Sequence, residues 1–308
     1  MRILFMGSGE IALPSLHWLI RSEHKIIAVV TQPDKPVGRH QVLTASAIKQ
    51  AALQAGIPVF QPIKIREPLA LAALQNLAPD CIIVMAYGQI LPKTLLDLPK
   101  VACLNLHASL LPRHRGASPI QSAILAGDAT TGITLMHMDV GLDTGDIVFA
   151  EEIPILQSDT AGILHDRLAD LGPVVLQKGL PLFMKNCAPR TPQNPDLVTL
   201  SGKLDRDSGR IDWTQSAIYL EHHIRAMHPW PGAYSILPNG KKLKIHRASV
   251  IFERGNPGQI VTSDSGKLTI GTGENILSLD EVQLEGRSRM SIADFLRGNP
   301  LAASTVFS

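Results

Sequence analysis

The most informative stretch of the chain is Cys103-Leu104-Asn105-Leu106-His107-Ala108-Ser109-Leu110-Leu111-Pro112-Arg113-His114-Arg115-Gly116. It starts as an apolar run typical of a buried strand and ends in a polar, basic loop. Asn105 and His107 are two positions apart, so on an extended strand their side chains project from the same face. The pattern therefore predicts an amide donor and an imidazole aimed at one point where a strand ends.

Strands and helices alternate around this stretch. Apolar runs predict strands at 2–6, 26–31, 58–61, 80–86, 101–107, 134–139 and 147–155. Helical spacing occurs at 11–21, 45–55, 67–77, 119–126 and 160–185. We expect a break in the last helix near Gly172-Pro173, and an irregular loop at the proline-containing 32–41. This alternation predicts an α/β fold, with a Rossmann-like, doubly wound, mostly parallel sheet.

The ends of four predicted strands carry candidate site residues. In a sheet of this kind, ligands bind outside the carboxyl ends of the strands. Gly7, Thr31, Tyr87 and His107 all occupy such ends. We therefore expect these four residues to gather around one cleft.

The C-terminal part has a different pattern. Residues 186–202 are rich in proline and lack apolar periodicity, which is typical of a linker. A helix at 216–227 is followed by short strands at 233–237, 242–252, 258–262, 267–271 and 278–284. These strands indicate a small OB-like β-barrel. The expected domains are 1–185, a linker at 186–204 and a C-terminal domain at 205–308.

Composition excludes few classes of protein. The 308 residues are 45% hydrophobic and 18% charged with a net charge of +2, too mild to indicate nucleic-acid binding and too weak to exclude it. Cys81, Cys103 and Cys187 form neither a metal spacing nor a disulfide framework, which suits a reducing cytosol. The sequence carries no signal-peptide pattern and no apolar run of membrane-spanning length. We expect a cytoplasmic protein without a membrane partner.

Two glycine-containing motifs leave alternatives open. Gly7–Ala12 matches G-x-G-x-x-A, so a nicotinamide-dependent oxidoreductase is a rival interpretation, although the second strand does not end in an acidic residue. Asp139, Asp143 and Asp146 share a loop that a hard metal could use, but their spacing is not that of an EF-hand. Asp139 and Asp146 are more typical of turn-forming residues. Asp143 could orient His107 and favour its protonated form.

The basic residues are equally open to two interpretations. Arg113 and Arg115 precede a predicted helix start and could hold an anion or form a solvated turn. Lys242, Lys244 and His246 alternate on one strand face, as in a phosphate-tracking stripe or a plain solvated face. The histidines match no zinc motif, and we expect no metal.

The three candidate catalytic residues indicate a chemistry. An amide and an imidazole can stabilise a developing oxyanion, and a carboxylate can hold the imidazole and relay protons. Asn105, His107 and Asp143 therefore favour acyl transfer in which the amine of a substrate attacks a carbonyl without a covalent enzyme intermediate.

Two motifs identify a family. Asn105–Pro112 together with Gly141–Asp146 resembles the folate-dependent formyltransferases. Further stretches resemble the branch of that family that acts on methionyl initiator tRNA, and the resemblance covers essentially the whole chain. These stretches are Thr31–Arg39, Gly202–Asp205, Ile211–Trp213 and Ile224–Gly232.

The resemblance implies a formyl group from 10-formyltetrahydrofolate and an acceptor amine on methionyl initiator tRNA. Asn105 and His107 would stabilise the oxyanion, while Asp143 would fix His107 and help to move the amine proton. Expected folate contacts are Ser109, Leu110, Leu111, Pro112, Gln89, Ile90, Leu91, Val140, Gly141 and Leu142.

The resemblance also implies tRNA contacts, and we expect a monomer. The loop with Lys35 and Arg39 would enter the major groove of the acceptor stem, and the barrel with Lys242 and Lys244 would track the tRNA backbone. The chain departs from the family at His40-Gln41-Val42, where glycine and lysines are common, and at His114, where an aromatic residue is usual. Two rivals stay open, namely a nucleotide-sugar amine as acceptor and a non-catalytic RNA-binding module that uses the barrel alone.

Overall fold

The chain forms two compact units in the computed structural model, which describes residues 1–38, 41–264, 266–303 and 305–307. The first unit comprises 1–119, 130–154 and 165–201, and the second comprises 120–129, 155–164 and 202–308. Residues 186–201, expected to belong to a linker, thus fold with the first unit. The limits 1–185, 186–204 and 205–308 stay a prediction.

A seven-stranded mixed sheet organises the first unit, in the order β10-β9-β7-β6-β1-β2-β5. The neighbours from β7 to β5 pair in parallel, whereas β9 and β10 are antiparallel to their neighbours. The predicted α/β class with a mostly parallel sheet is confirmed. The strands are β1 (Arg2–Gly7), β2 (Lys25–Val30), β5 (Val59–Phe60), β6 (Cys81–Met85), β7 (Ala102–His107), β9 (Thr130–His137) and β10 (Ile147–Pro154).

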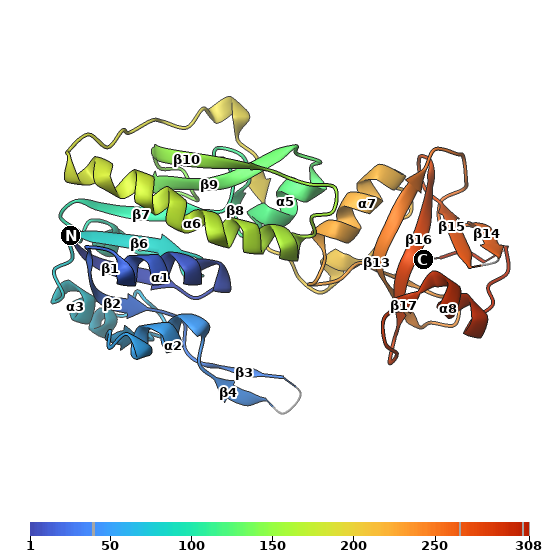
Figure 1. Cartoon of the computed structure of the whole chain (residues 1–308), viewed down its shortest axis with the longest axis horizontal. Coiled ribbons are helices and arrows are strands. Elements are labelled where there is room, and N and C mark those ends of the chain that lie inside the picture. Colours follow the sequence, from blue (N-terminus) through green and yellow to red (C-terminus); the bar gives the residue numbers. More distant parts are fainter. Residues whose placement is uncertain (39–40, 265, 304, 308) are drawn as a thin grey trace. The chain divides into compact units, whose positions relative to one another are not determined.

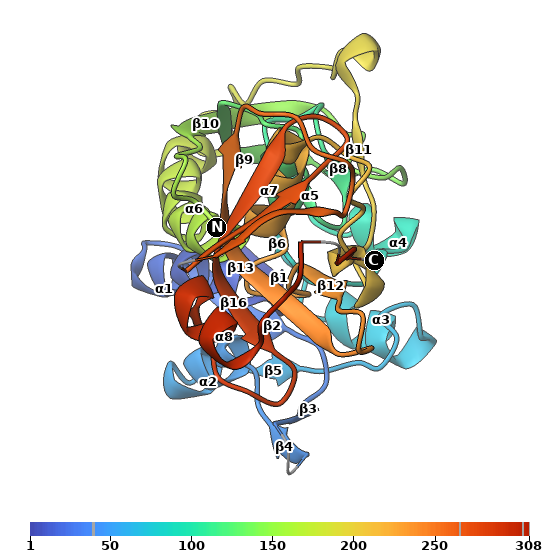
Figure 2. The same cartoon turned by 90° about the vertical axis from the view of Figure 1, so that its right-hand side faces the viewer.

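Helices cover both faces of this sheet. Figure 2 shows α1 and α6 on one face and α3 and α4 on the other. Leu4 and Met6 are two positions apart on β1, so both side chains face the same side of the sheet. On that side they pack with Leu74 of α3 and Leu95 of α4 in one buried cluster. The helices and short elements are η1 (Glu10–Ala12), α1 (Leu13–Arg21), α2 (Ala47–Gln54), α3 (Pro68–Gln75), α4 (Lys93–Leu96), β8 (Arg115–Gly116), α6 (Ala161–Met184), η2 (Pro195–Leu197) and β11 (Leu200–Ser201).

A β-hairpin begins inside the segment predicted to be an irregular loop, 32–41. Strands β3 (Lys35–Val37) and β4 (Val42–Thr44) pair antiparallel, with Pro36 opposite Leu43. Proline is tolerated in this two-stranded ribbon because an edge strand has no second neighbour that needs its missing N–H. The prediction of an irregular loop at 32–41 is therefore wrong at Lys35–Val37, while 39–40 lie outside the described residues.

Helix α6 is continuous through Pro173, so the predicted break near Gly172-Pro173 is wrong. A Cβ atom at Gly172 would overlap the Ser15 hydroxyl of α1, so the glycine allows two helices to approach closely. Although α6 is long, within the described ranges no helix combines the length and apolarity that a bilayer crossing requires.

An antiparallel sheet forms the framework of the second unit, in the order β12-β13-β16-β15-β14, with β17 paired to β16 (Figure 1). Within the described ranges no pairing between β12 and β14 closes it into a barrel. The elements are α5 (Pro119–Leu125), η3 (Asp207–Gly209), α7 (Ala217–Ala226), β12 (Tyr234–Ile236), β13 (Lys242–Ile251), β14 (Ile260–Asp264), β15 (Lys267–Gly271), β16 (Ile276–Leu284), β17 (Met290–Ser291) and α8 (Ile292–Gly298).

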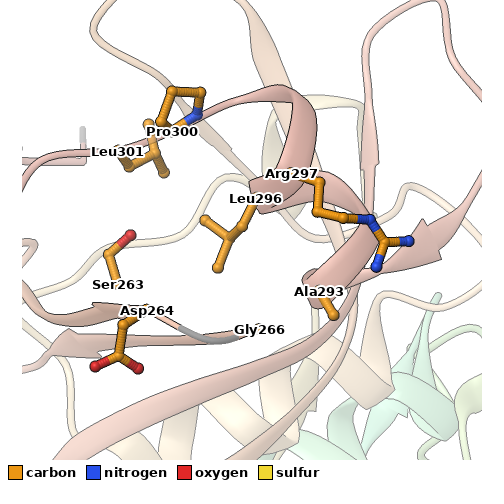
Figure 3. A pocket seen from close by; sticks show the side chains of 8 residues that line it. All are labelled: Ser263, Asp264, Gly266, Ala293, Leu296, Arg297, Pro300 and Leu301. Atoms are coloured by element: carbon orange, nitrogen blue, oxygen red, sulfur yellow. The ribbon is translucent and has the colours of Figure 1, made fainter.

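A hollow of about 430 Å³ lies beside α8 in this second unit (Figure 3). Its lining mixes polar and apolar side chains, and it contains none of the predicted site residues. The lining residues are Ser263, Asp264, Gly266, Ala293, Leu296, Arg297, Pro300 and Leu301.

Candidate active site

Asn105 and His107 lie on β7, in the interior of the seven-stranded sheet. Asn105 pairs with Val84 of β6 on one side and Met136 of β9 on the other. Both side chains are buried, with 9% of Asn105 and 5% of His107 exposed. A strand with neighbours on both edges holds its side chains in fixed directions, so this pair is rigidly placed.

Asp143 meets both residues. Its Oδ1 accepts a hydrogen bond from Asn105 Nδ2 at 3.4 Å, and its Oδ2 lies 3.6 Å from His107 Nδ1. The closest donor to the carboxylate is the backbone N–H of Gly116, 2.9 Å from Oδ2. The structure thus brings the three predicted catalytic residues together and adds Gly116 to them.

Asp143 reaches the end of β7 through a long loop. The strand that precedes this loop, β9, is antiparallel to β7, with His137 opposite Leu104. The loop starts beside Cys103, whose carbonyl accepts from Met138 N at 2.8 Å. It then returns to Asn105 and His107, with Asp143 in a left-handed conformation at φ +51°.

Two opposing effects set the protonation of His107. Burial lowers the pKa of its imidazole and is the larger effect, while the Asp143 carboxylate raises it. The net pKa lies below the ordinary value, so the ring is neutral at neutral pH. Asp143 therefore acts in the expected direction, by favouring the protonated form, although burial has the larger effect on the pKa. His107 Nε2 donates to the His114 carbonyl oxygen at 3.0 Å, which leaves Nδ1 as the basic nitrogen facing Asp143.

The turn at 109–112 is held from inside. The Ser109 hydroxyl donates to the Arg113 carbonyl at 2.6 Å, and Thr134 Oγ1 donates to the Ser109 carbonyl at 2.7 Å. Thr134 Oγ1 also accepts from Leu111 N at 3.1 Å. Ser109 and Leu111 are buried, whereas Leu110 and Pro112 are half-buried. Of these four expected folate contacts, Leu110 and Pro112 have accessible side chains.

The other expected folate contacts fall into two kinds. The Gln89 side chain accepts from Ile65 N at 2.7 Å and donates to the Ile63 carbonyl at 3.2 Å, so it supports a loop, and Leu91 is buried. The exposed apolar side chains are Ile90, Val140 and Leu142, at 90%, 75% and 59% exposure, and Gly141 lies between the last two. Apolar side chains that solvent reaches this freely are free to contact a ligand.

The glycine turn at Gly7–Gly9 is hydrogen-bonded to residues at the ends of neighbouring strands. The N–H groups of Ser8 and Gly9 both donate to the Ala86 carbonyl oxygen, at 3.2 and 3.3 Å. The Ser8 hydroxyl accepts from Gln32 N and donates to the Tyr87 carbonyl. These bonds bring together the ends of β1, β2 and β6, near Gly7, Thr31 and Tyr87, whereas the cleft that was to include His107 stays a prediction. They also favour glycines that turn the chain over glycines that cradle a pyrophosphate.

The other two aspartates of the loop, Asp139 and Asp146, interact with neighbouring residues of the protein. Asp139 Oδ1 accepts from Gly141 N at 3.0 Å and from the Thr144 hydroxyl at 2.6 Å, as a turn-forming residue does. Asp146 lies 3.6 Å from the Arg190 guanidinium. Over the ranges that the structure describes, no three His, Cys, Asp or Glu side chains are grouped so as to hold a metal ion.

The expected tRNA contacts are spread over both units. Lys35 is exposed on β3, and Arg39 lies outside the described residues. Lys242 Nζ lies 3.6 Å from the centre of the Tyr234 ring, a cation–π contact, and Lys244 pairs with Tyr234 on the neighbouring strand. Both lysines are half-buried on β13 in the second unit.

Sequence reasoning missed two residues near Asp143. Gly116 stood at the end of the basic loop without a signal for its role. Gln193 lay in the segment interpreted as a linker, yet its Oε1 accepts from Arg115 Nε and Nη2 at 2.9 and 2.8 Å. Arg115 is therefore bound within the protein, which argues against a solvated turn at this residue.

Known proteins resemble this chain along its whole length. Residues 1–180 match the family described as formyl transferase, and 203–300 match the formyl transferase C-terminal domain. A methionyl-tRNA formyltransferase of Alkaliphilus oremlandii is 46% identical over 308 residues, covering 99% of both chains. One of Akkermansia muciniphila is 48% identical over 306 residues, covering 97% of both.

Solved structures share the fold at low identity. WlaRD, a sugar 3N-formyl transferase crystallised in the presence of dTDP and 5-N-formyl-THF, superposes with a TM-score of 0.69 at 19% identity, covering 94% of this chain and 99% of that one. HypX from Aquifex aeolicus in complex with tetrahydrofolic acid has a TM-score of 0.60 at 18% identity, covering 96% of this chain and 47% of that one.

Proposed function

The chain belongs to the formyl transferase family, and we propose that it transfers the formyl group of 10-formyltetrahydrofolate to the amino group of methionyl initiator tRNA. The product is N-formylmethionyl-tRNA for translation initiation. One observation carries the proposal: Asn105, His107 and Asp143 meet in a chain that aligns end to end with methionyl-tRNA formyltransferases.

Asn105 would stabilise the negative charge that develops during the reaction. When bound, 10-formyltetrahydrofolate supplies a formyl carbon that the methionyl amine attacks, so that charge grows on the formyl oxygen. The Asn105 amide is a buried donor held on a central strand, and such a donor stabilises charge without reorganising. Its hydrogen bond to Asp143 is long, at 3.4 Å, so it can turn toward a stronger acceptor.

His107 would accept the proton of the attacking amine, and Asp143 would stabilise the protonated ring. The lowered pKa leaves His107 neutral, with its basic Nδ1 3.6 Å from Asp143 Oδ2. A proton released by the amine would add to Nδ1, and the carboxylate would stabilise the resulting imidazolium. That proton would then pass to the tetrahydrofolate nitrogen as its bond to the formyl carbon breaks, so that tetrahydrofolate leaves neutral. The His114 carbonyl orients the neutral ring at its Nε2 end, and Asp143 would hold the ring once Nδ1 is protonated.

The exposed apolar side chains support a folate subsite. Ile90, Val140 and Leu142 are more exposed than apolar residues usually are, and a planar pterin would cover such surface. Leu110 and Pro112 add accessible apolar surface after β7. Ser109, Gln89, Leu91 and Leu111 would act by shaping the surrounding loops. The chemistry of this set fits an aromatic, largely apolar ligand.

Basic side chains on both units support the tRNA substrate. The β3–β4 hairpin presents Lys35, and β13 presents Lys242 and Lys244. The proposed tRNA contacts also include Arg39, which matches a tRNA-contacting arginine of the family. A cytoplasmic location and a monomeric enzyme are part of the proposal, since charged tRNA is a cytoplasmic substrate.

The test is formyl transfer by the purified chain from 10-formyltetrahydrofolate to methionyl initiator tRNA. We expect formylmethionyl-tRNA to accumulate in proportion to enzyme, and uncharged tRNA to yield no product. A folded preparation that leaves the tRNA unmodified would refute the proposal. Formylation of a nucleotide-sugar amine without activity on tRNA would establish the rival acceptor instead.

A further inference from the structure

The Gln193 side chain links the loop that carries Asp143 to Arg115. Its Nε2 donates to the backbone carbonyls of Asp143 and Gly145, each at 2.8 Å. Its Oε1 accepts from Nε and Nη2 of Arg115. A glutamine amide offers two N–H donors and one acceptor oxygen with two lone pairs, so this side chain uses its whole hydrogen-bonding capacity.

The segment that carries Gln193 is itself fixed. Thr191 and Ile147 exchange two backbone hydrogen bonds, at 2.8 and 3.0 Å. On the other side of Gln193, β11 pairs in parallel with β8, and Thr199 Oγ1 accepts from His114 N at 2.8 Å. Gln193 therefore sits between two anchored points, and the position of its amide is determined.

The two groups that Gln193 holds meet each other at Asp143. On one side it binds the Asp143 backbone carbonyl, which sets where that residue lies. On the other it binds Arg115, whose neighbour Gly116 supplies the closest donor to the Asp143 carboxylate. One side chain thus fixes both partners of the bond that orients Asp143.

We propose that Gln193 is a positioning residue for formyl transfer. It sets the distance between the Asp143 carboxylate and the Gly116 amide, and through Asp143 it sets the orientation of His107. The inference rests on the proposed function for its kinetic consequence, whereas its geometric part concerns the Asp143 loop alone. A displacement of about 1 Å at a reacting group can cost roughly 100-fold in rate, so this role has a measurable size.

Gln193→Glu keeps an acceptor oxygen on the side chain and removes its N–H donors. The carboxylate still accepts from Arg115, but it has no N–H for the carbonyls of Asp143 and Gly145 and repels both oxygens. We expect kcat to fall about 10- to 100-fold, with the KM for tRNA within about twofold. The acid limb of the kcat–pH profile should move, because the partner of His107 has moved. Asn194→Ala is the matched control, since Asn194 is exposed and its side chain accepts from Asp196 N within its own turn.

A second readout does not need activity. We expect the Gly116 amide to exchange with deuterium at least tenfold faster in Gln193→Glu than in the parent or in Asn194→Ala, as measured by NMR. Amides of the β1–β6 ladder should keep their parent rates. Unchanged Gly116 exchange, or faster exchange throughout the first unit, would overturn the positioning role, as would kcat within threefold of the parent with the same pH profile. If the parent forms no product while Gly116 exchange responds, the proposed function fails and the geometric inference stands.

Discussion

Replacing Gly116 by alanine tests the surroundings of Asp143 with a single methyl group. Gly116 has φ +122°, a conformation that L-residues rarely adopt, and a Cβ atom there would overlap the Ser201 carbonyl oxygen. The overlap is with backbone, so β8 must move away from β11. The Gly116 N–H moves with it and withdraws from Asp143 Oδ2.

The size of the effect follows from these two costs. A non-glycine residue in such a conformation costs about 1–3 kcal/mol, which corresponds to a melting temperature lower by roughly 2–12 °C for a unit of this size. A hydrogen bond to a charged acceptor contributes about 1.5–3 kcal/mol, and its loss at Asp143 would slow kcat by about 10- to 150-fold. Thermal unfolding and steady-state formylation at saturating substrates measure the two effects.

Gly202→Ala is the control. A Cβ atom at Gly202 meets nothing within 4 Å, and its φ lies outside the left-handed region, so we expect parent behaviour. If Gly116→Ala also keeps the parent melting temperature and a kcat within threefold, the Gly116 amide does not hold Asp143 and the reasoning is refuted.

Two further predictions concern the hairpin and pH. Lys49 Nζ and Gln61 Nε2 both lie 2.7 Å from the Asp34 carboxylate at the base of β3. Lys49→Met should therefore loosen the hairpin and raise the KM for tRNA several-fold at a nearly unchanged kcat. An unchanged KM would show that this ion pair does not position the hairpin. Burial lowers the pKa of His24, His107, His137, His222, His223, His228 and His246 below that of an unfolded chain. The unfolded chain therefore binds more protons below about pH 6.5, and the free energy of unfolding should fall as pH drops from 6.5 through the lowered values. In urea titrations from pH 7.5 to 5.5, His223→Gln should make this decline shallower by at most about 1.4 kcal/mol per pH unit, and a flat profile in the parent would contradict the assignment.

The main strands were predictable from sequence because their apolar runs are short and bounded by glycine, proline or polar residues. The Asn105–His107 pair was predictable for the same reason, since alternation on a strand is a local property. The placement of Asp143 near His107 was also predicted, but the antiparallel direction of β9 was not, because it depends on pairing between distant segments. The β3–β4 hairpin was hidden by Pro36, whose usual effect is to exclude strands, although an edge position tolerates it.

Gln193 shows a second limit. Residues 186–202 lack apolar periodicity, and their order comes from hydrogen bonds to Ile147, Arg115 and the Asp143 loop rather than from burial. Such bonds leave no pattern in the local sequence. The lowered pKa of His107 was unpredictable for a related reason, since its burial, which depends on the fold, outweighs the visible charge of Asp143.

The most direct test of the three-residue centre is the rate of formylation by His107→Ala and Asp143→Ala, measured in single turnovers together with the Kd for methionyl initiator tRNA. Both side chains act on the proton of the attacking amine, so each variant should lose at least about 100-fold in rate while its Kd stays within about twofold of the parent. A rate within about tenfold of the parent, or a loss that appears mainly in tRNA affinity, would show that His107 and Asp143 build structure and do not carry the reaction.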